Sequence, residues 1–250
     1  MYKFDAKDAI EKCVKWIQDW FEANGNGCNA VIGISGGKDS TVAAGLLVKA
    51  LGKDRVIGVM MPNHTQSDIS DSQKVCDFLD IRHYRINIGD SVDVVIESML
   101  KGGDFTISEQ TLINLPPRIR MSTLYAVSQS NNGRVVNTCN YSEDYVGYST
   151  RYSDSAGDFS PLGKFTKTEV CLIGKELGLP IELVDKAPSD GLCGKTDEDN
   201  LGFTYAELDA YIREGIEPDA VKKAKINRLH KMNLFKLEVI PTFDYKGGEE

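Results

Sequence analysis

The sequence predicts an α/β fold in which a doubly wound parallel sheet carries helices on both faces and further helices follow it. Short apolar runs, such as residues 30–34 and 55–61, have the composition of strands that are buried on both faces. Amphipathic segments with helical spacing separate these runs, and strands that alternate with helices form parallel sheets. A glycine-rich turn follows the first apolar run directly, at the edge where open α/β sheets bind their ligands.

The first two thirds of the chain supply the strands and the helices between them. We expect a first helix over residues 5–23, because its apolar residues fall on one stripe and two Asn-Gly pairs follow it. Pro116-Pro117 is expected to open a helix that runs to Gln129, since proline is tolerated in a first helical turn. The other expected elements are strands at residues 82–88 and 134–137 and helices at residues 40–51, 66–79 and 91–100.

The final third of the chain lacks this alternation. We expect helices there at residues 166–177, 204–214 and 219–232. Residues 188–200 are polar, acidic and contain glycine, so we expect them to form a mobile loop. The 250 residues are enough for one large α/β domain and too few for two, and we expect residues 1–250 to form a single domain.

Composition narrows the function classes. The formal net charge is −8 and the sequence pI is about 5.1, so most of the surface would repel a long nucleic acid, whose affinity depends on neutralised phosphates. No apolar run has membrane-spanning length, and the first residues contain no signal peptide. The six cysteines include no C-x-x-C pair, which favours reduced thiols. We therefore expect a cytoplasmic protein that binds small molecules, with no nucleic acid or membrane partner.

The most informative motif lies between the first strand and the next helix, and we refer to it as the glycine loop. Adjacent glycines allow backbone N–H groups to face an anion, and the N-terminus of the following helix points the same way. Lys38 adds a positive charge, and Asp39 is suited to bind Mg²⁺ through oxygen. The glycine loop consists of Gly33, Ile34, Ser35, Gly36, Gly37, Lys38, Asp39 and Ser40.

This loop resembles the S-G-G-x-D-S loop of the PP-loop ATP pyrophosphatases, which split ATP into AMP and pyrophosphate. It matches neither the Walker pattern nor the dinucleotide-binding pattern. The resemblance implies a Rossmann-like sheet of the PP-loop type. The alternative is a glycine-rich strand–helix turn that binds no ligand, which the complete hexapeptide after a buried strand disfavours.

Beyond the glycine loop, residues 10–243 resemble the NAD synthetase family. The matching segments are M-P-N-H-T-Q-S at 61–67, R-I-R-M at 118–121, T-C-N-Y-S-E at 138–143, T-R-Y-S-D-S-A-G-D at 150–158, K-T-E-V at 167–170, K-A-P-S at 186–189 and H-K at 230–231. Three residues depart from the family pattern, since Pro117 stands where the family has alanine and Asn137 and Ser153 stand where it usually has glycine.

The resemblance implies a role for each matching residue. Lys38, Asp39 and Lys167 would be catalytic, and Asp39 and Glu143 would bind Mg²⁺. ATP would contact the glycine loop and Thr138, Lys167 and Ser189. Deamido-NAD, the second substrate, would contact Arg118, Arg151, Asp158, His230 and Lys231. Taken alone, a lysine in the first turn of a helix opposes the helix dipole and so suggests an anion nearby.

The function implied by the resemblance is the ammonia-dependent last step of NAD biosynthesis. A carboxylate on the pyridine ring of deamido-NAD would attack the α-phosphorus of ATP, and ammonia would then displace AMP from the acyl adenylate. Glutamine-dependent relatives carry an amidase domain, for which 250 residues leave no room. Residues 188–200 would close over the reacting groups as a lid.

The resemblance also implies a homodimer. The apolar stripe of the first helix, at Ile10, Val14, Ile17 and Phe21, suits either that contact or the core of a single chain.

Three other functions compete with this interpretation. Another PP-loop ligase, such as the ATP domain of a GMP synthetase, is expected to lack the segments at 150–158 and 167–170 in this order. A tRNA-modifying enzyme would need a basic face, which the acidic composition disfavours. The intact acidic and basic residues at Asp39, Glu143 and Lys167 argue against a nucleotide-binding module without catalysis.

Overall fold

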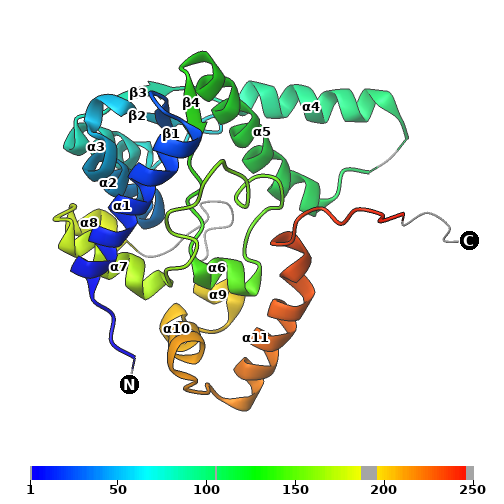
Figure 1. Ribbon diagram of the computed structural model, residues 1–250. Helices are drawn as coiled ribbons and strands as arrows, with labels where there is room; N and C mark the ends of the chain where they lie inside the picture. Colours follow the sequence, from blue (N-terminus) through cyan, green and yellow to red (C-terminus); the bar gives the residue numbers. More distant parts are fainter. Residues whose placement is uncertain (1, 105, 187–195, 246–250) are drawn as a thin grey trace, which may run out of the picture.

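The computed structural model describes residues 2–104, 106–186 and 196–245. Its centre is a parallel sheet with the strand order β3-β2-β1-β4 (Figure 1). The strands are β1 (Asn29–Gly33), β2 (Val56–Met60), β3 (Arg82–Arg85) and β4 (Gly133–Val135). From β1 the chain winds outward through β2 and β3 and then returns to the other side of β1 for β4. The predicted α/β fold with a parallel sheet is confirmed, and the direction of winding reverses between β1 and β4.

One face of the sheet packs on four helices. They are α1 (Ala6–Asn24), α2 (Lys38–Leu51), α3 (Ile69–Leu79) and α7 (Lys167–Glu176), with the short α8 (Ile181–Val184) beside them. Ile10, Ile17 and Phe21 of α1 are buried in this layer, and Val14 packs against it. The apolar stripe of the first helix therefore belongs to the core of the single chain and is not left over for a partner.

The opposite face packs mainly on α5 (Glu109–Ser130), whose Leu124 is buried against strand residues such as Val31. The expectation that Pro116-Pro117 opens this helix was wrong. The helix begins at Glu109, where Ser108 accepts a hydrogen bond from the amide of Thr111 at 3.1 Å, and both prolines lie inside it. Each proline removes one backbone hydrogen bond. The helix keeps its others over 22 residues and packs on the sheet, so it continues through the pair.

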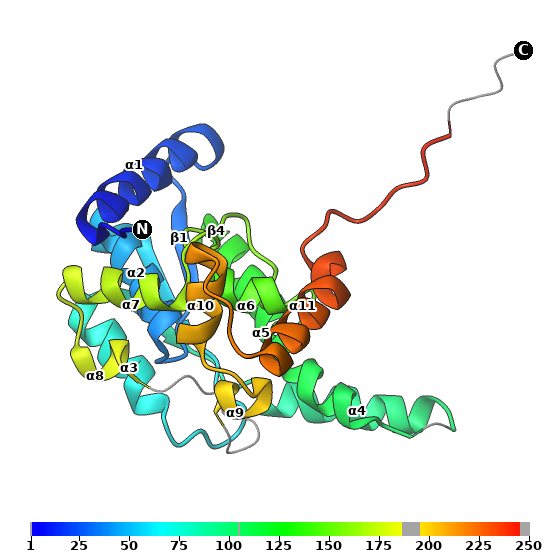
Figure 2. The ribbon, with the colours of Figure 1, turned by 90° about the horizontal axis from the view of Figure 1, so that it is seen from below.

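The helix α4 (Gly89–Gly102) precedes α5 and projects away from the body of the molecule (Figures 1 and 2). The short 3₁₀ segment η1 (Lys53–Arg55) leads into β2. Among the residues that the structure describes, no helix combines the length and the hydropathy needed to cross a membrane.

The C-terminal helices form a separate layer with its own small core. This layer comprises α6 (Tyr141–Val146), α9 (Asp197–Leu201), α10 (Tyr205–Glu214), α11 (Ala220–Asn233) and η2 (Leu234–Lys236). Its helices α9, α10 and most of α11 lie toward the lower end of the molecule in Figure 1. Leu208 and Ile226 are fully buried within it. Part of the loop expected at residues 188–200 is helical, because Thr196 and Asp199 form a capping box that starts α9. The rest of that expected lid, residues 188–195, lies outside the described residues.

Close packing between α2 and α7 depends on Gly174, and it yields a test of the fold. A β-carbon at this position would lie 2.9 Å from methyl groups of both Val42 and Val184. We expect Gly174→Ala to lower the free energy of unfolding by about 1–3 kcal/mol, the usual cost of overpacking.

Urea unfolding followed by circular dichroism measures this change. Gly102→Ala is the matched control, because Gly102 also lies in a helix but has open space around it. It should leave stability unchanged or raise it by up to about 1 kcal/mol. A Gly174→Ala variant as stable as the wild type would contradict the packing described here.

Candidate active site

The site lies at the carboxyl edge of the sheet, where the winding reverses. The glycine loop follows β1, and residues 136–140 follow the neighbouring strand β4. The amide of Val136 bonds to the carbonyl of Val31 at 2.9 Å, so the segments that follow β1 and β4 leave the sheet side by side. Open parallel sheets bind ligands at such a reversal.

The glycine loop has the geometry of an anion cradle. Gly36 has a φ of 77°, and a β-carbon there would lie 2.7 Å from the backbone nitrogen of Ser72, so the loop sits directly against α3. Gly37 is the N-cap of α2, which begins at Lys38 and not at Ser40 as expected. No side chain caps this end of α2, and the free amides and the helix dipole of such an N-terminus favour an anion.

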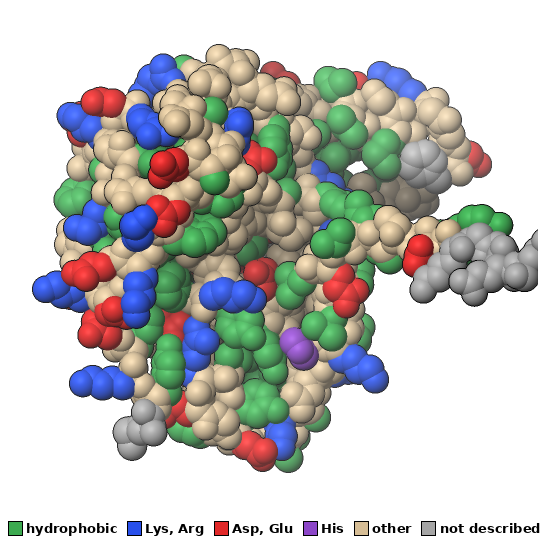
Figure 3. All heavy atoms as spheres, viewed as in Figure 1, with side chains coloured by type: hydrophobic (Ala, Val, Ile, Leu, Met, Phe, Trp, Pro, Cys, Tyr) green, Lys and Arg blue, Asp and Glu red, His purple; other side chains and the backbone are tan. Residues whose placement is uncertain are grey.

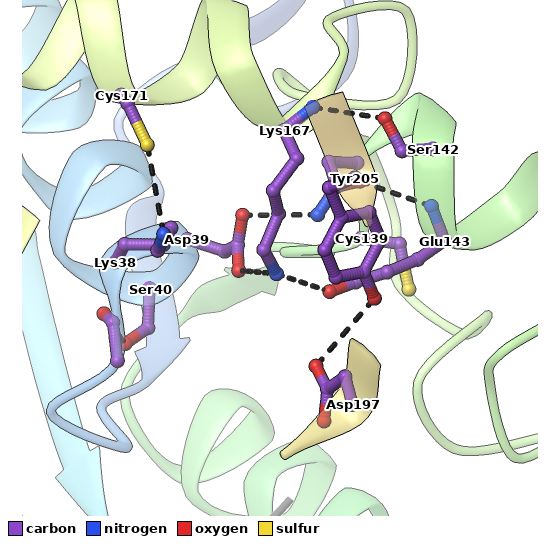
Figure 4. A network of polar contacts seen from close by, with 12 residues as sticks. Lys38, Asp39, Ser40, Cys139, Ser142, Glu143, Lys167, Cys171, Asp197 and Tyr205 are labelled. Atoms are coloured by element: carbon purple, nitrogen blue, oxygen red, sulfur yellow. Dashed lines mark hydrogen bonds and ion pairs between the residues drawn. The ribbon is translucent and has the colours of Figure 1, made fainter. Parts of the chain in front are cut away.

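Next to this N-terminus, an ammonium group lies between two carboxylates (Figure 4). The Nζ of Lys167 is 2.9 Å from Asp39 Oδ2 and 2.5 Å from Glu143 Oε1. The Lys167 side chain is only 6% exposed, while those of Asp39 and Glu143 are 19% and 16% exposed. Three residues that are 24 to 128 positions apart in sequence thus meet at one point with a narrow opening to solvent.

The Asn140 side chain joins the two carboxylate-bearing elements, and sequence reasoning missed it. Its Oδ1 accepts the backbone amide of Glu143 at 3.0 Å, which starts α6. Its Nδ2 donates to Asp39 Oδ1 at 3.0 Å, and the residue is fully buried. An asparagine three residues before a glutamate is a recognised signal for a helix start, so this residue could have been found as a cap, although not as a ligand of Asp39.

Burial and charge set the protonation of this cluster. Burial works to lower the pKa of Lys167, but Asp39 and Glu143 outweigh it and hold that pKa well above its ordinary value. Burial raises the pKa of Glu143 to about 7, against the lowering effect of Lys167. The Lys167 ammonium is therefore charged at neutral pH, and its two carboxylate partners explain how a lysine is tolerated in the first turn of α7.

The donor set fits a magnesium ion that also binds phosphate. Two carboxylates converge on one cation, and Mg²⁺ in nucleotide sites typically uses one or two carboxylates together with phosphate oxygens. The described residues contain no cluster of three or more His, Cys, Asp or Glu side chains placed to hold a metal ion. This pair therefore suits an ion that arrives with a nucleotide better than a structural metal held by protein alone.

Two further residues expected to contact ATP, Lys38 and Thr138, belong to the described part of the chain. Lys38 extends toward α7, where its Nζ is 3.6 Å from the sulfur of Cys171 (Figure 4). Thr138 is half-buried just after β4. Ser189 lies outside the described residues.

Two arginines expected to contact deamido-NAD are brought together. The Nε of Arg118 on α5 donates to the backbone carbonyl of Arg151 at 3.3 Å. The guanidinium of Arg151 lies between two aromatic rings, 4.9 Å from the centroid of Tyr152 and 5.0 Å from that of Phe235. Sequence reasoning missed Phe235, because only the fold brings η2 beside residue 151.

The remaining three expected residues have different surroundings. Asp158 bonds to the backbone amide of Val135 at 2.7 Å and to the hydroxyl of Tyr125 at 3.3 Å. His230 stacks on a tyrosine ring, and its Nδ1 is 2.7 Å from the carbonyl of Tyr145. A carbonyl only accepts hydrogen bonds, so Nδ1 carries the proton. Lys231 is exposed on α11.

The two residues that replace family glycines are accommodated without left-handed backbone. Neither Asn137 nor Ser153 has a positive φ, and in the turn around Ser153 the left-handed residue is Tyr152, with a φ of 64°. Asn137 is buried and bonds through Nδ2 to the carbonyls of Asp154 and Ala156, the latter at 2.9 Å. Ser153 is also buried. Asn137 thus fastens the loop that follows Arg151 to the end of β4.

A parallel sheet with a glycine loop, a basic residue and two carboxylates at its reversal point defines a nucleotide-binding protein of the PP-loop class. Residues 9–240 match the family model described as NAD synthase. The chain belongs to the NAD synthase family, whose members are ligases.

Relatives and solved structures agree with this assignment. An NH(3)-dependent NAD(+) synthetase of Thermococcus sibiricus is 38% identical over 96% of this chain and 92% of its own length. The structure of an NMN synthetase from Francisella tularensis aligns with a TM-score of 0.89 at 35% identity, over 97% of this chain and 100% of its own. An NH3-dependent NAD synthetase from Campylobacter jejuni aligns with a TM-score of 0.79 at 27% identity, over 97% and 100%.

The raised pKa of Glu143 predicts a pH dependence of stability. Between about pH 4.5 and 7 the folded protein keeps a proton on Glu143 that the unfolded chain releases. The stability from this group is full below about pH 4.5 and is lost as the pH rises through about 7. Glu143→Gln removes this loss, so we expect the variant to gain stability relative to the wild type between pH 5 and pH 8.

Urea unfolding at the two pH values, without ATP or Mg²⁺, measures the effect. The exposed Glu182 provides the control, since Glu182→Gln should follow the wild type at both. A Glu143→Gln variant whose difference from the wild type is the same at pH 5 and pH 8 would contradict the prediction.

Proposed function

We propose that this chain is an ammonia-dependent NAD synthetase, which amidates deamido-NAD to NAD with ATP and releases AMP and diphosphate. The observation that carries this proposal is the convergence of Asp39, Glu143 and Lys167 beside the uncapped N-terminus of α2. Membership of the NAD synthase family supports the choice of reaction. The chain spans 92% of a relative named NH(3)-dependent NAD(+) synthetase, which supports ammonia as the source of nitrogen.

The reaction needs a carboxylate to gain a leaving group. The carboxylate of deamido-NAD attacks the α-phosphorus of ATP, and pyrophosphate leaves with the electron pair of the broken P–O bond. Ammonia then adds to the acyl adenylate, AMP leaves, and the nitrogen loses a proton. Positioning and charge neutralisation at phosphorus are the protein's contribution, and no covalent enzyme intermediate is required.

The residues of this chain divide the work. The amides of the glycine loop and the N-terminus of α2 hold phosphate oxygens, and Lys38 and Lys167 neutralise their charge. Asp39 and Glu143 would hold Mg²⁺, which neutralises further charge on the phosphates when it is bound. Arg118 and Arg151 would contact phosphates of deamido-NAD.

His230 and Lys231 would contact the same substrate from α11. With its proton on Nδ1, a neutral His230 presents Nε2 as a hydrogen-bond acceptor. Asp158 would contact deamido-NAD while keeping its bond to the edge of β4.

A second candidate is the amidation of nicotinate mononucleotide to NMN. The specific observation in its favour is the TM-score of 0.89 to a structure named NMN synthetase, with complete coverage of that chain. The reacting carboxylate is the same in both substrates, so the cluster around Lys167 serves either. The two differ in the adenylyl half, which only deamido-NAD carries.

One assay tests the reaction and separates the two substrates. The purified protein is incubated with ATP, Mg²⁺, an ammonium salt and either deamido-NAD or nicotinate mononucleotide, and products are separated by chromatography. We expect NAD and AMP in equal amounts from deamido-NAD. Faster turnover of nicotinate mononucleotide would replace the first candidate by the second, and no AMP from either would reject both.

In this assay Asp39→Asn should lower kcat by roughly 10²–10³-fold, since one charged group that acts at the transition state is lost. Asp80→Asn is the matched control, because Asp80 pairs with Lys53 on the surface, away from the cluster. A fully active Asp39→Asn variant would remove Asp39 from the mechanism.

We further propose that the enzyme acts in the cytoplasm as a homodimer. Reduced cysteines support the first point, and the five described cysteines are all free. For the second, the projecting α4 carries Val94 and Leu100 exposed to solvent, and the start of α5 adds Leu112 and Ile113. Figure 3 shows hydrophobic side chains along this projection. A second copy would cover such a patch, since monomers rarely leave a contiguous apolar surface open.

The homodimer is tested by sedimentation of a charged variant. Leu100→Asp combined with Leu112→Asp places two charges in the proposed interface, and we expect the mass to fall from that of a dimer to that of a monomer at micromolar concentration. Phe78→Asp alters an equally exposed apolar residue on α3 and should leave the mass unchanged. A wild-type monomer would reject the homodimer, and a double variant that stays dimeric would reject this interface.

A further inference from the structure

A further carboxylate, that of Asp209 on α10, is buried behind the cluster of Asp39, Glu143 and Lys167 and bonds to neighbours of its members. It is only 5% exposed. Its Oδ2 accepts the backbone amide of Thr168 at 2.8 Å, and its Oδ1 accepts the hydroxyl of Ser142 at 2.5 Å. The same Ser142 oxygen accepts the backbone amide of Lys167 at 2.9 Å (Figure 4). Asp209 is thus one hydrogen bond from α7 and one from α6.

The charge of Asp209 is balanced by the first turn of α7. Within the described part of the chain, no lysine, arginine or histidine forms an ion pair with this carboxylate. A buried charge is costly unless polar groups compensate it. The compensation here comes from the amide of Thr168, the hydroxyl of Ser142 and the positive end of the α7 dipole. The interaction therefore fixes the turn that carries Lys167.

The helices do not need this contact in order to form or to pack. Thr166 and Glu169 already form a complete capping box at the start of α7. Arg213, one turn further along α10, already joins the two helices through Glu169 at 2.6 Å. What Asp209 adds is a bond to the amide of Thr168, which follows Lys167, and a bond to Ser142, which precedes Glu143.

We propose that Asp209 is a positioning residue for the reaction. Acting through Ser142 and the first turn of α7, it holds Lys167 and Glu143 in register with Asp39. The same helix also contacts the other end of Lys167, because the Tyr205 ring lies 5.0 Å from its Nζ. The C-terminal layer, which also supplies Glu143, thereby sets the geometry of a cluster whose other members, Asp39 and Lys167, belong to helices packed on the sheet. This inference rests on the proposed ATP-dependent function.

The test is Asp209→Asn, which keeps the size of the side chain but replaces one acceptor by a donor. The bond from the Thr168 amide loses its charge assistance, and the Ser142 hydroxyl must turn from donor to acceptor to keep its bond to the new amide group. We expect kcat to fall about 10- to 100-fold, as small displacements of reacting groups do. The KM for the pyridine-nucleotide substrate should change by less than about threefold, since Arg118 and Arg151 lie on other elements.

Arg213→Ala is the matched control for structural effects. It removes a tie between the same two helices without touching Ser142 or Lys167. We expect it to lower the melting temperature at least as much as Asp209→Asn while leaving kcat within about twofold of the wild type. If the role of Asp209 is purely structural, both variants should lose activity in proportion to their loss of stability, and that result would contradict the proposal.

A double-mutant cycle with Ser142→Ala tests the proposed route. If Asp209 acts through Ser142, the double variant should be little slower than the slower single variant, because coupled residues are not additive. Multiplicative losses would overturn this route. Ser142→Ala also serves alone if Asp209→Asn does not fold, and wild-type activity in that variant would overturn the proposal.

Binding of MgATP separates this inference from the proposed function. Calorimetry needs no acceptor substrate, and we expect Asp209→Asn, but not Arg213→Ala, to raise the Kd of MgATP by about tenfold. A wild type that forms no amidated product would reject the proposed function while this comparison still decides the role of Asp209. Equal Kd and kcat in Asp209→Asn and the wild type would overturn the inference.

Discussion

The ammonium group of Lys167 lies between the carboxylates of Asp39 and Glu143. This contact joins the helices packed on the sheet to the C-terminal layer at the site. Asp39 belongs to the helix that follows β1, whereas Glu143 starts the C-terminal layer. Two carboxylates this close would repel each other without a cation between them. Lys167 supplies that cation, and the buried Asn140 bonds both to the Asp39 carboxylate and to the backbone amide of Glu143.

The same arrangement reconciles an acidic chain with anionic substrates. The net charge of −8 describes the whole surface, whereas binding depends on the local field at one edge of the sheet. There the N-terminus of α2 meets Lys38 and Lys167, and the arginine pair Arg118 and Arg151 lies beyond them. Positive groups thus gather near the point where the sheet reverses, although the chain as a whole is acidic.

The sequence predicted those parts of the molecule that local patterns determine. The strands, the glycine loop and the alternation of helices follow from residues close in the chain, and they are confirmed. The start of α5 was misjudged because a proline pair signals a boundary locally, whereas packing on the sheet and the cap at Ser108 carry the helix through it. The contacts of Asn140 with Asp39 and of Asp209 with Thr168 span 101 and 41 residues, so no local pattern could reveal them.

Substrate choice is decided away from the chemistry. In the proposed reaction the cluster around Lys167 serves the triphosphate of ATP and the pyridine carboxylate, and both candidate substrates present the same carboxylate. Discrimination would then depend on groups that reach the rest of the nucleotide, for which we propose Arg118 and Arg151, with Phe235 packed beside Arg151. Because Phe235 comes from the C-terminal layer, that layer bears on both ends of the reaction. Its α10 bonds to the first turn of α7, which carries Lys167, and its η2 places the Phe235 ring 5.0 Å from the Arg151 guanidinium.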